Sequence, residues 1–249
     1  MPMNKLGSAA LVALGIIASV SLVLYALPYF IAPVSIDGLG GFLPDSGTPD
    51  RDPSLAWLGA LSASGLVAYA LAAAPIVAVC AVRYYHLNPI LVVSAAAWLE
   101  LSFMLELLNN LPLVVRFLMP PTAAPVGLGD EALTWLAQLS ALDYYALDVP
   151  GFMLAYVGLA LLAAVLYRHS RSLAIITAAS FTLFLANIPF LWLEPKILAC
   201  ILLGLAVLAF AVFPLIMVKV SLSPCRQPHK HPFREEGDSI MTNQGSSSD

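Results

Sequence analysis

Long, unbroken apolar runs dominate this chain of 249 residues, and several are about as long as a bilayer is thick. A helix needs about 20 consecutive apolar residues to cross the hydrocarbon core of a membrane. A transmembrane β-strand would instead alternate apolar and polar residues over roughly ten positions, and these runs do not alternate. The pattern therefore predicts an all-α, polytopic integral membrane protein built as a helical bundle.

The scarcity of charged residues supports the same class. Charged residues make up 10% of the chain and hydrophobic residues 60%, whereas about a quarter of the residues in a soluble domain are charged. No basic stripe typical of nucleic-acid binding is present. Cys80 and Cys200 lie inside apolar runs and Cys225 in a polar tail, so no disulfide framework is implied. We expect the lipid bilayer, and no nucleic acid, as a partner.

The apolar runs predict six membrane-spanning helices in two groups of three. The first run ends in the bulky sequence Leu27-Pro28-Tyr29-Phe30, so we interpret it as an uncleaved span and not as a signal peptide. Residues 1–221 then form the transmembrane domain and residues 222–249 a disordered polar tail. The spans are expected at residues 8–31, 55–82, 90–111, 149–167, 172–193 and 197–218, and the third helix is able to continue to Leu118.

An additional helix is predicted at residues 132–147, before the fourth span. Asp130 and Glu131 are suited to a helix start, and an apolar stripe follows them that Gln138 and Asp143 interrupt. We interpret this segment as an interfacial helix on the outer surface or beside the bundle.

Basic residues predict the orientation of the bundle. With cytoplasmic termini, eight of the eleven Lys and Arg residues lie inside and three lie outside or near the outer interface, as the positive-inside rule requires. We therefore expect both termini in the cytoplasm and the bundle in a plasma or inner membrane. The inner set is Lys5, Arg83, Arg168, Arg171, Lys219, Arg226, Lys230 and Arg234, and the outer set is Arg51, Arg116 and Lys196.

Aromatic residues gather near the predicted span ends, where an aromatic belt would meet the lipid headgroups. The belt is expected to contain Tyr29, Phe30, Trp57, Tyr84, Tyr85, Tyr167 and Trp192.

The third apolar run differs from the others because polar and ionisable residues interrupt it. Such groups are costly at membrane depth and commonly mark functional sites. At roughly 100° per residue, four of them share one face of the helix, and Arg116 falls near that face. Glu100 points roughly 120° away from it. The four residues on the shared face are Ser102, Glu106, Asn109 and Asn110.

A second acidic group lies at a similar predicted depth near the outer ends of the spans. Asp143 and Asp148 can join the third helix in one outward-facing ligand or ion site. In the alternative interpretation, Asp148 caps a helix and the polar face of the third helix only holds the bundle together through hydrogen bonds. The complete candidate site is Ser102, Glu106, Asn109, Asn110, Arg116, Asp143 and Asp148.

Motifs for cofactor or metal chemistry are absent from the sequence. There is no phosphate-binding glycine loop, no His-Glu-x-x-His and no Gly-x-Ser-x-Gly. Cys225, His229 and His231 offer metal-binding groups, but we interpret them as part of a solvated tail. We expect no metal and no cofactor.

Three functions fit these observations. The leading hypothesis is a small carrier or permease for a polar or cationic small molecule or a proton, with Glu106 cycling between its charged and neutral forms. The alternative is a non-transporting sensor or an assembly partner for another membrane protein. A membrane-embedded enzyme would need Asp143 or Asp148 to lie beside Glu106, and we expect an enzyme less than the other two classes.

Overall fold

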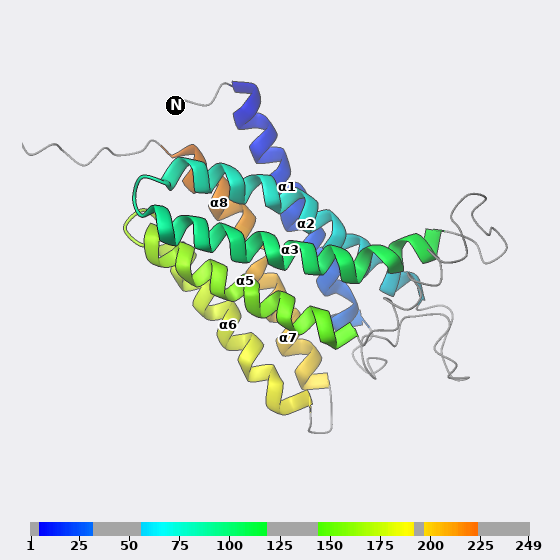
Figure 1. Ribbon diagram of the computed structural model, residues 1–249. Coiled ribbons are helices and arrows are strands. Elements are labelled where there is room, and N and C mark those ends of the chain that lie inside the picture. Colours follow the sequence, from blue (N-terminus) through cyan, green and yellow to red (C-terminus); the bar gives the residue numbers. More distant parts are fainter. Residues whose placement is uncertain (1–4, 32–55, 119–143, 192–196, 224–249) are drawn as a thin grey trace, which may run out of the picture.

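The computed structural model describes residues 5–31, 56–118, 144–191 and 197–223, and within these ranges it contains helices, turns and no strand. Side chains at both ends of some helices, including those of residues 115–118, 144–149 and 188–191, lie outside the described part. Figure 1 shows the helices, which are α1 (Lys5–Ile31), α2 (Ala56–Tyr84), α3 (Pro89–Leu118), α5 (Tyr144–Leu166), α6 (Arg171–Leu191), α7 (Ile197–Phe210) and α8 (Phe213–Leu222).

Four helical segments among the described residues are long and apolar enough to cross a membrane. They are Lys5–Ile31, Trp57–Tyr84, Pro89–Leu111 and Ile197–Leu222, the last of which contains both α7 and α8. Two shorter apolar helices cover Pro150–Leu166 and Arg171–Asn187. The all-helical class and a membrane location are therefore supported. The six predicted spans coincide largely with these helices, and that all six cross the bilayer stays a prediction.

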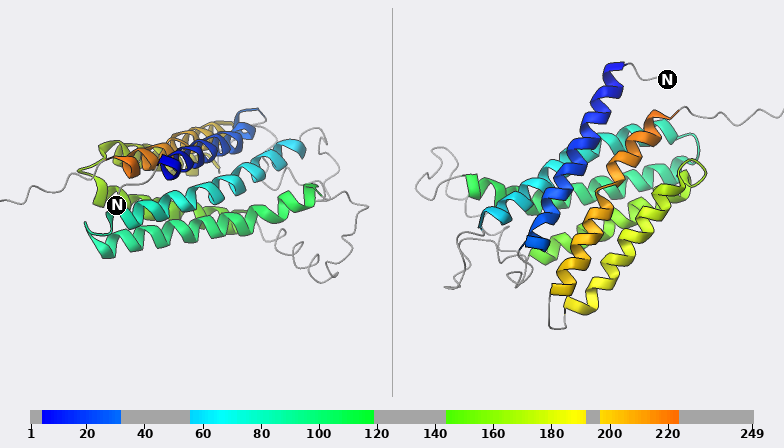
Figure 2. Two further views of the ribbon diagram at one scale, coloured as in Figure 1. Left: turned by 90° about the horizontal axis from the view of Figure 1, so that it is seen from above. Right: turned by 180° about the vertical axis from the view of Figure 1, so that it is seen from behind.

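The helices pack into a closed ring. Each helix contacts the next along the chain, from α1 through α2, α3, α5 and α6 to α7, and α7 and α8 return to α1. Contacts are most extensive between α3 and α5 and between α1 and α2. Figure 2 shows α1 crossing α2 and α3 at an angle, with its N-terminal part projecting beyond them. The core of the ring is apolar and contains, for example, Leu22, Leu66 and Leu159.

Two glycines allow helix backbones to approach closely, as small residues do in membrane bundles. A Cβ atom added at Gly65 in α2 would lie 2.6 Å from the carbonyl oxygen of Ser21 in α1. A Cβ at Gly158 in α5 would lie 2.9 Å from the carbonyl oxygen of Ala95 in α3. The two most extensive helix pairs therefore cross at positions where there is no room for a larger residue.

The last predicted span, residues 197–218, is divided into two helices and extends to Leu222. The division follows from Pro214, which stands in the first turn of α8. Proline has no N–H to donate to the carbonyl oxygen four residues earlier, here that of Phe210. At the division, the Val212 N–H bonds to the Ala209 carbonyl oxygen at 3.4 Å, a tighter spacing than the α-helical one.

Polar contacts join α2, α8 and the turn between α5 and α6 at one end of the bundle. The Arg83 guanidinium donates a hydrogen bond to the backbone carbonyl of Ser223. The Tyr84 hydroxyl donates to the Val220 carbonyl at 2.9 Å, and the Tyr84 ring meets the His169 ring at 5.5 Å between centroids. Tyr84 is therefore buried and does not face lipid headgroups.

The predicted aromatic belt is only partly present. Phe30, Trp57, Tyr85 and Tyr167 are exposed, as a belt requires. Tyr29, like Tyr84, is buried and was assigned wrongly to the belt, because its hydroxyl pairs with that of Tyr25 at 3.0 Å inside the bundle. Position near a span end does not say which face of the helix a tyrosine occupies. Trp192 lies outside the described residues.

Two predicted segments fall largely outside the described part of the chain. Of the predicted interfacial helix at 132–147, residues 132–143 are not described, and Tyr144 to Leu147 belong to the first turns of α5. The predicted disordered tail at 222–249 is described only at Leu222 and Ser223.

We expect Gly65→Ala to destabilise the bundle, because the new methyl group forces the backbones of α1 and α2 apart. The cost should be about 1–3 kcal/mol, as for other overpacked positions. Thermal unfolding of the purified protein in detergent measures it. Ser64→Ala is the matched control, because Ser64 is the exposed neighbour on the same helix. Equal melting temperatures for the two variants would contradict this account of the crossing.

A buried polar cluster on α3

Four polar residues predicted to share one face of α3 do so, and that face points into the bundle. The exposed fractions are 2% for Ser102, 3% for Glu106, 6% for Asn109 and 0% for Asn110. Residues on the opposite face of the same helix are exposed, for example Met104 at 56%. The four residues are therefore part of the closed interior in this structure and do not line an open, solvent-accessible path.

The remaining predicted site residues are not brought into the cluster by any described contact. Arg116 lies in α3 and Asp148 in α5, but their side chains are outside the described part of the chain. Asp143 lies outside the described residues altogether. A catalytic pair of carboxylates formed with Glu106 therefore stays an untested hypothesis.

The Glu106 carboxyl group lies at the junction of α3 and α5. The side-chain amide of Asn110, one turn further along α3, donates to the Glu106 backbone carbonyl at 3.0 Å and to Oε2 at 3.4 Å. On the other side, a Cβ atom at Gly151 of α5 would lie 2.7 Å from Oε1. The carboxyl group thus occupies the space that any larger residue at position 151 would take.

Tyr69 of α2 completes this side of the cluster. Its hydroxyl group lies within electrostatic range of the Glu106 carboxyl and of the Tyr156 hydroxyl. Its ring packs edge-on against Phe103 of α3, with centroids 5.6 Å apart, and against Phe210 of α7, at 6.0 Å. These ring contacts hold the hydroxyl group inside the bundle.

Two buried oxygen atoms of the cluster keep unused hydrogen-bonding capacity. Neither the Tyr69 hydroxyl nor the Asn110 side-chain carbonyl oxygen has a hydrogen-bond partner among the described residues. Most buried polar atoms in proteins are paired, so each exception requires an explanation. Here both exceptions belong to residues that interact with Glu106.

A chain of hydroxyl groups extends the polar region across the bundle. The Tyr156 hydroxyl of α5 and the Ser180 hydroxyl of α6 share a hydrogen bond of 2.7 Å. Ser180 in turn donates to the backbone carbonyl of Ala206 in α7 at 2.9 Å. Asn187, further along α6, is also buried, and its side-chain oxygen has no partner among the described residues. The polar groups thus connect α2, α3, α5, α6 and α7.

Three of these residues were not predicted from the sequence, namely Tyr69, Tyr156 and Ser180. A signal for the two tyrosines exists, because they stand in the middle of apolar runs and not at the ends, where lipid headgroups would explain them. Ser180 carries no such signal, since single serines are common in membrane helices. Gly151 carries no such signal either, since small residues are common in membrane helices, and its role appears only with Glu106 packed against it.

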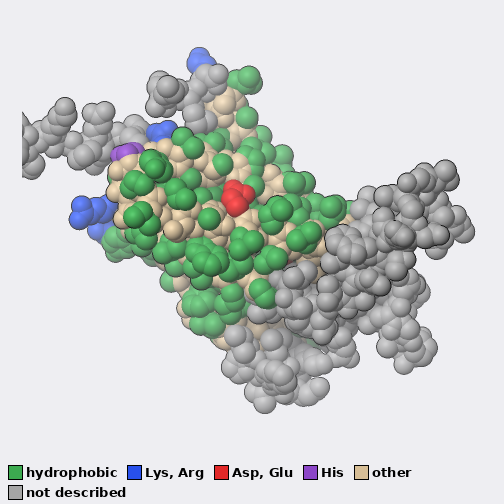
Figure 3. All heavy atoms as spheres, viewed as in Figure 1, with side chains coloured by type: hydrophobic (Ala, Val, Ile, Leu, Met, Phe, Trp, Pro, Cys, Tyr) green, Lys and Arg blue, Asp and Glu red, His purple; other side chains and the backbone are tan. Residues whose placement is uncertain are grey.

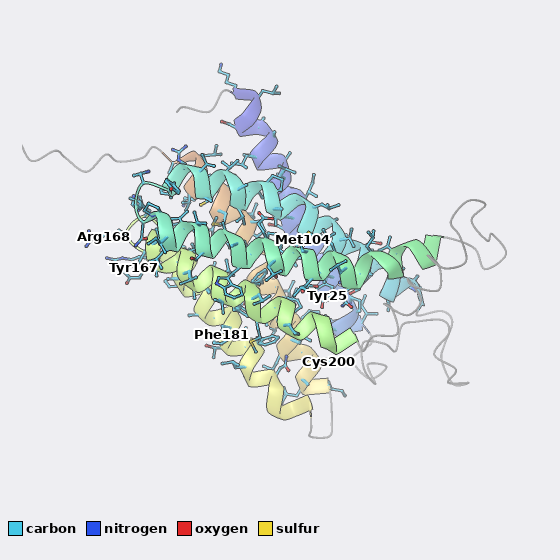
Figure 4. All side chains as sticks on the ribbon, viewed as in Figure 1. Tyr25, Met104, Tyr167, Arg168, Phe181 and Cys200 are labelled. Carbon is cyan, nitrogen blue, oxygen red and sulfur yellow. The ribbon has the colours of Figure 1, made fainter. Side chains whose placement is uncertain are left out.

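The arrangement suits the binding of a polar or positively charged group. A carboxyl group accepts or releases a proton, and amide and phenol oxygens accept hydrogen bonds or lie close to a cation. Among the described residues, no group of three or more His, Cys, Asp or Glu side chains has the spacing of a metal site. The Phe181 ring packs against the Tyr156 ring with centroids 5.1 Å apart, and Figure 4 shows Phe181 on the α5–α6 side of the bundle.

Comparisons with known proteins add no assignment. The chain matches no known protein family, no curated protein and no solved structure.

We expect Gly151→Ala to push the Glu106 carboxyl out of its place and to destabilise the protein by about 1 kcal/mol, the range of mild overpacking. In a Glu106→Ala background the same change should cost much less, because the competing carboxyl is gone. A double-mutant cycle, read from unfolding in mixed detergent, measures the coupling between the two positions. Equal costs in both backgrounds would show that Gly151 and Glu106 do not share this space.

Proposed function

We propose that this protein is a small membrane carrier that moves a polar or cationic solute, or a proton, through a site at Glu106. One observation carries the proposal: Glu106 is 3% exposed inside an apolar helical bundle, beside the Asn110 amide of its own helix and within electrostatic range of the Tyr69 hydroxyl of α2. A carboxyl in the interior of a membrane bundle is expensive to keep, and such groups commonly lie on substrate or proton pathways.

The unused acceptors beside Glu106 support binding of a donor-rich solute. The Asn110 carbonyl oxygen and the Tyr69 hydroxyl oxygen are buried and unpaired within the described part of the chain. An ammonium or guanidinium group, or a hydronium ion, donates hydrogen bonds and brings positive charge to the carboxyl. Such a solute satisfies both oxygens and offsets the cost of burying Glu106.

The break between α7 and α8 lies next to the cluster and is a point at which the helix backbone can bend. Phe210, the last residue of α7, packs against Tyr69 at 6.0 Å and against Tyr156 at 5.8 Å between ring centroids. Broken membrane helices beside polar sites are frequent in transporters, because the break loosens the backbone next to the solute. The buried cluster corresponds to an occluded state, and rotation at this break would open it.

The proposed topology has six crossings with both termini in the cytoplasm. Basic residues gather at the end of the bundle where α2 meets α3 and α5 meets α6, and Figure 3 shows Lys, Arg and His atoms confined to this side and to the N-terminal tip. At this end the Arg171 guanidinium lies 6.0 Å from the centre of the Tyr167 ring. Tyr167 and Arg168 are labelled there in Figure 4. The positive-inside rule makes this end cytoplasmic.

One observation favours a second candidate function, that of a non-transporting sensor or assembly partner. Asn110 donates to Glu106 within the same helix, and the cluster is closed to solvent. In addition, the hydrogen bonds from Tyr156 to Ser180 and from Ser180 to the Ala206 carbonyl join α5, α6 and α7, and bonds of this kind between helices stabilise membrane bundles without any transport.

Glu106→Gln should abolish transport while leaving the bundle folded, because glutamine keeps the shape and loses the titratable charge. The measurement is uptake into liposomes that contain the purified protein, driven by a pH gradient. The probes are an internal pH-sensitive dye and radiolabelled methylammonium, guanidinium and arginine. At least a tenfold loss is expected, as for other essential intramembrane charges (about 1.4 kcal/mol or more). Glu100→Gln is the matched control, because it removes the same charge from the same helix outside the cluster.

Two outcomes separate the candidates. Uptake by the wild type and the Glu100→Gln variant, lost in the Glu106→Gln variant, supports the carrier. Equal uptake of all probes by the wild type and the Glu106→Gln variant contradicts the carrier. If the melting temperature of the variant is also lowered, the result favours the structural role.

The topology predicts which positions a membrane-impermeant maleimide labels. In a Cys225→Ser background, Asn88→Cys and Ser170→Cys should react only from the cytoplasmic side, and Gly40→Cys and Thr122→Cys only from the opposite side. Right-side-out and inside-out vesicles allow the comparison. Labelling of positions 88 and 122 from the same side would contradict the proposed path of the third helix.

A further inference from the structure

Glu100 stands on the exposed side of α3, at the middle of an apolar segment that is long enough to cross a membrane. The apolar segment of this helix runs from Pro89 to Leu111, so Glu100 is eleven residues from either end, or about 16 Å along the helix. That distance is about half the thickness of the hydrocarbon core. The side chain is partly exposed and is not part of the buried cluster around Glu106.

The surroundings of Glu100 on the surface are apolar. One turn away on α3, Met104 is 56% exposed, and Val93, Leu101 and Leu108 are exposed as well. Figure 3 shows a single patch of acidic atoms within the otherwise apolar or uncharged face of the described residues, over the helices α2, α3 and α5. An ionisable side chain at this depth ordinarily faces the bundle interior or a water-filled cavity, because lipid cannot solvate its charge. The Glu100 side chain faces neither the bundle interior nor a water-filled cavity among the described residues.

The described part of the bundle does not provide a partner for this carboxyl. No hydrogen bond or ion pair joins Glu100 to another described residue. A glutamate side chain is also too short to reach the headgroups from the membrane centre, as lysine and arginine do near helix ends. The partner must therefore approach from the membrane side.

A second copy of the chain cannot supply a cation at this depth. Helices α5 and α7 contain no basic residue, and the basic residues of the other described helices stand at or near the helix ends. They are Lys5, Arg83, Arg116, Arg171 and Lys219. Charge complementarity thus requires a different protein.

We propose that the outer face of α3 around Glu100 docks a transmembrane helix of another protein that carries a lysine or arginine at mid-membrane. The cation pairs with the Glu100 carboxyl, and apolar side chains of the partner pack against Met104 and Leu101 on either side. Pairing removes two charges from lipid contact at once, so the ion pair specifies both the depth and the rotation of the partner helix. This role does not depend on the carrier function proposed for Glu106.

The test uses the full-length protein in liposomes, labelled with a donor fluorophore at Cys225, and a synthetic Leu/Ala transmembrane helix labelled with an acceptor. Four peptides are compared, with lysine at the centre, leucine at the centre, glutamine at the centre, or lysine two turns from the centre. Energy transfer should show roughly tenfold tighter association of the central-lysine peptide with the wild type, near the upper end for one polar contact between membrane helices. Glu100→Gln should remove this preference.

The Glu106→Gln variant is the matched control, because it removes a carboxyl from the interior side of the same helix. This variant should retain the preference for the central-lysine peptide. Equal binding of the four peptides to the wild type would overturn the proposal, as would a preference that survives in Glu100→Gln. A third overturning result is Glu100-dependent energy transfer between two differently labelled copies of the protein without peptide, which would make this face a self-association surface.

Discussion

The contact between α3 and α5 is the interaction on which the candidate site depends. Gly158 brings the two backbones together at Ala95 and Leu99, and Gly151, two turns earlier on α5, leaves space that the Glu106 carboxyl fills. Within a bilayer there is no water to compensate a polar group, so a carboxyl is costly there unless protein groups surround it. Because the two glycines have no side chains, they leave the space in which Glu106 is buried.

The two glutamates of α3 are only six positions apart, yet they lie in opposite environments. Glu106 faces the interior beside Asn110, whereas Glu100 is partly exposed among apolar residues on the outer surface of the bundle. Their difference follows from helical geometry, because six residues rotate the side chain by roughly 240°, or 120° the other way. The proposed roles assign the inner carboxyl of this helix to a solute and the outer carboxyl to a partner helix, and single substitutions separate the two roles.

The aromatic side chains connect the polar cluster to the break between α7 and α8. Phe210 lies at that break and touches both Tyr69 and Tyr156, whose hydroxyl groups belong to the polar region. Phe210 also packs against Phe213, the first residue of α8, with ring centroids 5.7 Å apart. A continuous row of aromatic contacts therefore joins the break beside Pro214 to the groups around Glu106.

The sequence by itself determined the membrane-helical class, the approximate helix positions and the shared polar face of α3, because apolar length and the helical period are local properties. It also placed Glu100 apart from that face. Only the tertiary structure decided that the face is closed, that Tyr69 and Tyr156 join it, and that Tyr29 and Tyr84 turn inward. Those outcomes depend on which helices become neighbours and how closely glycines let them approach. Contacts between residues as distant as Glu106 and Gly151 leave no periodic signal in a single chain.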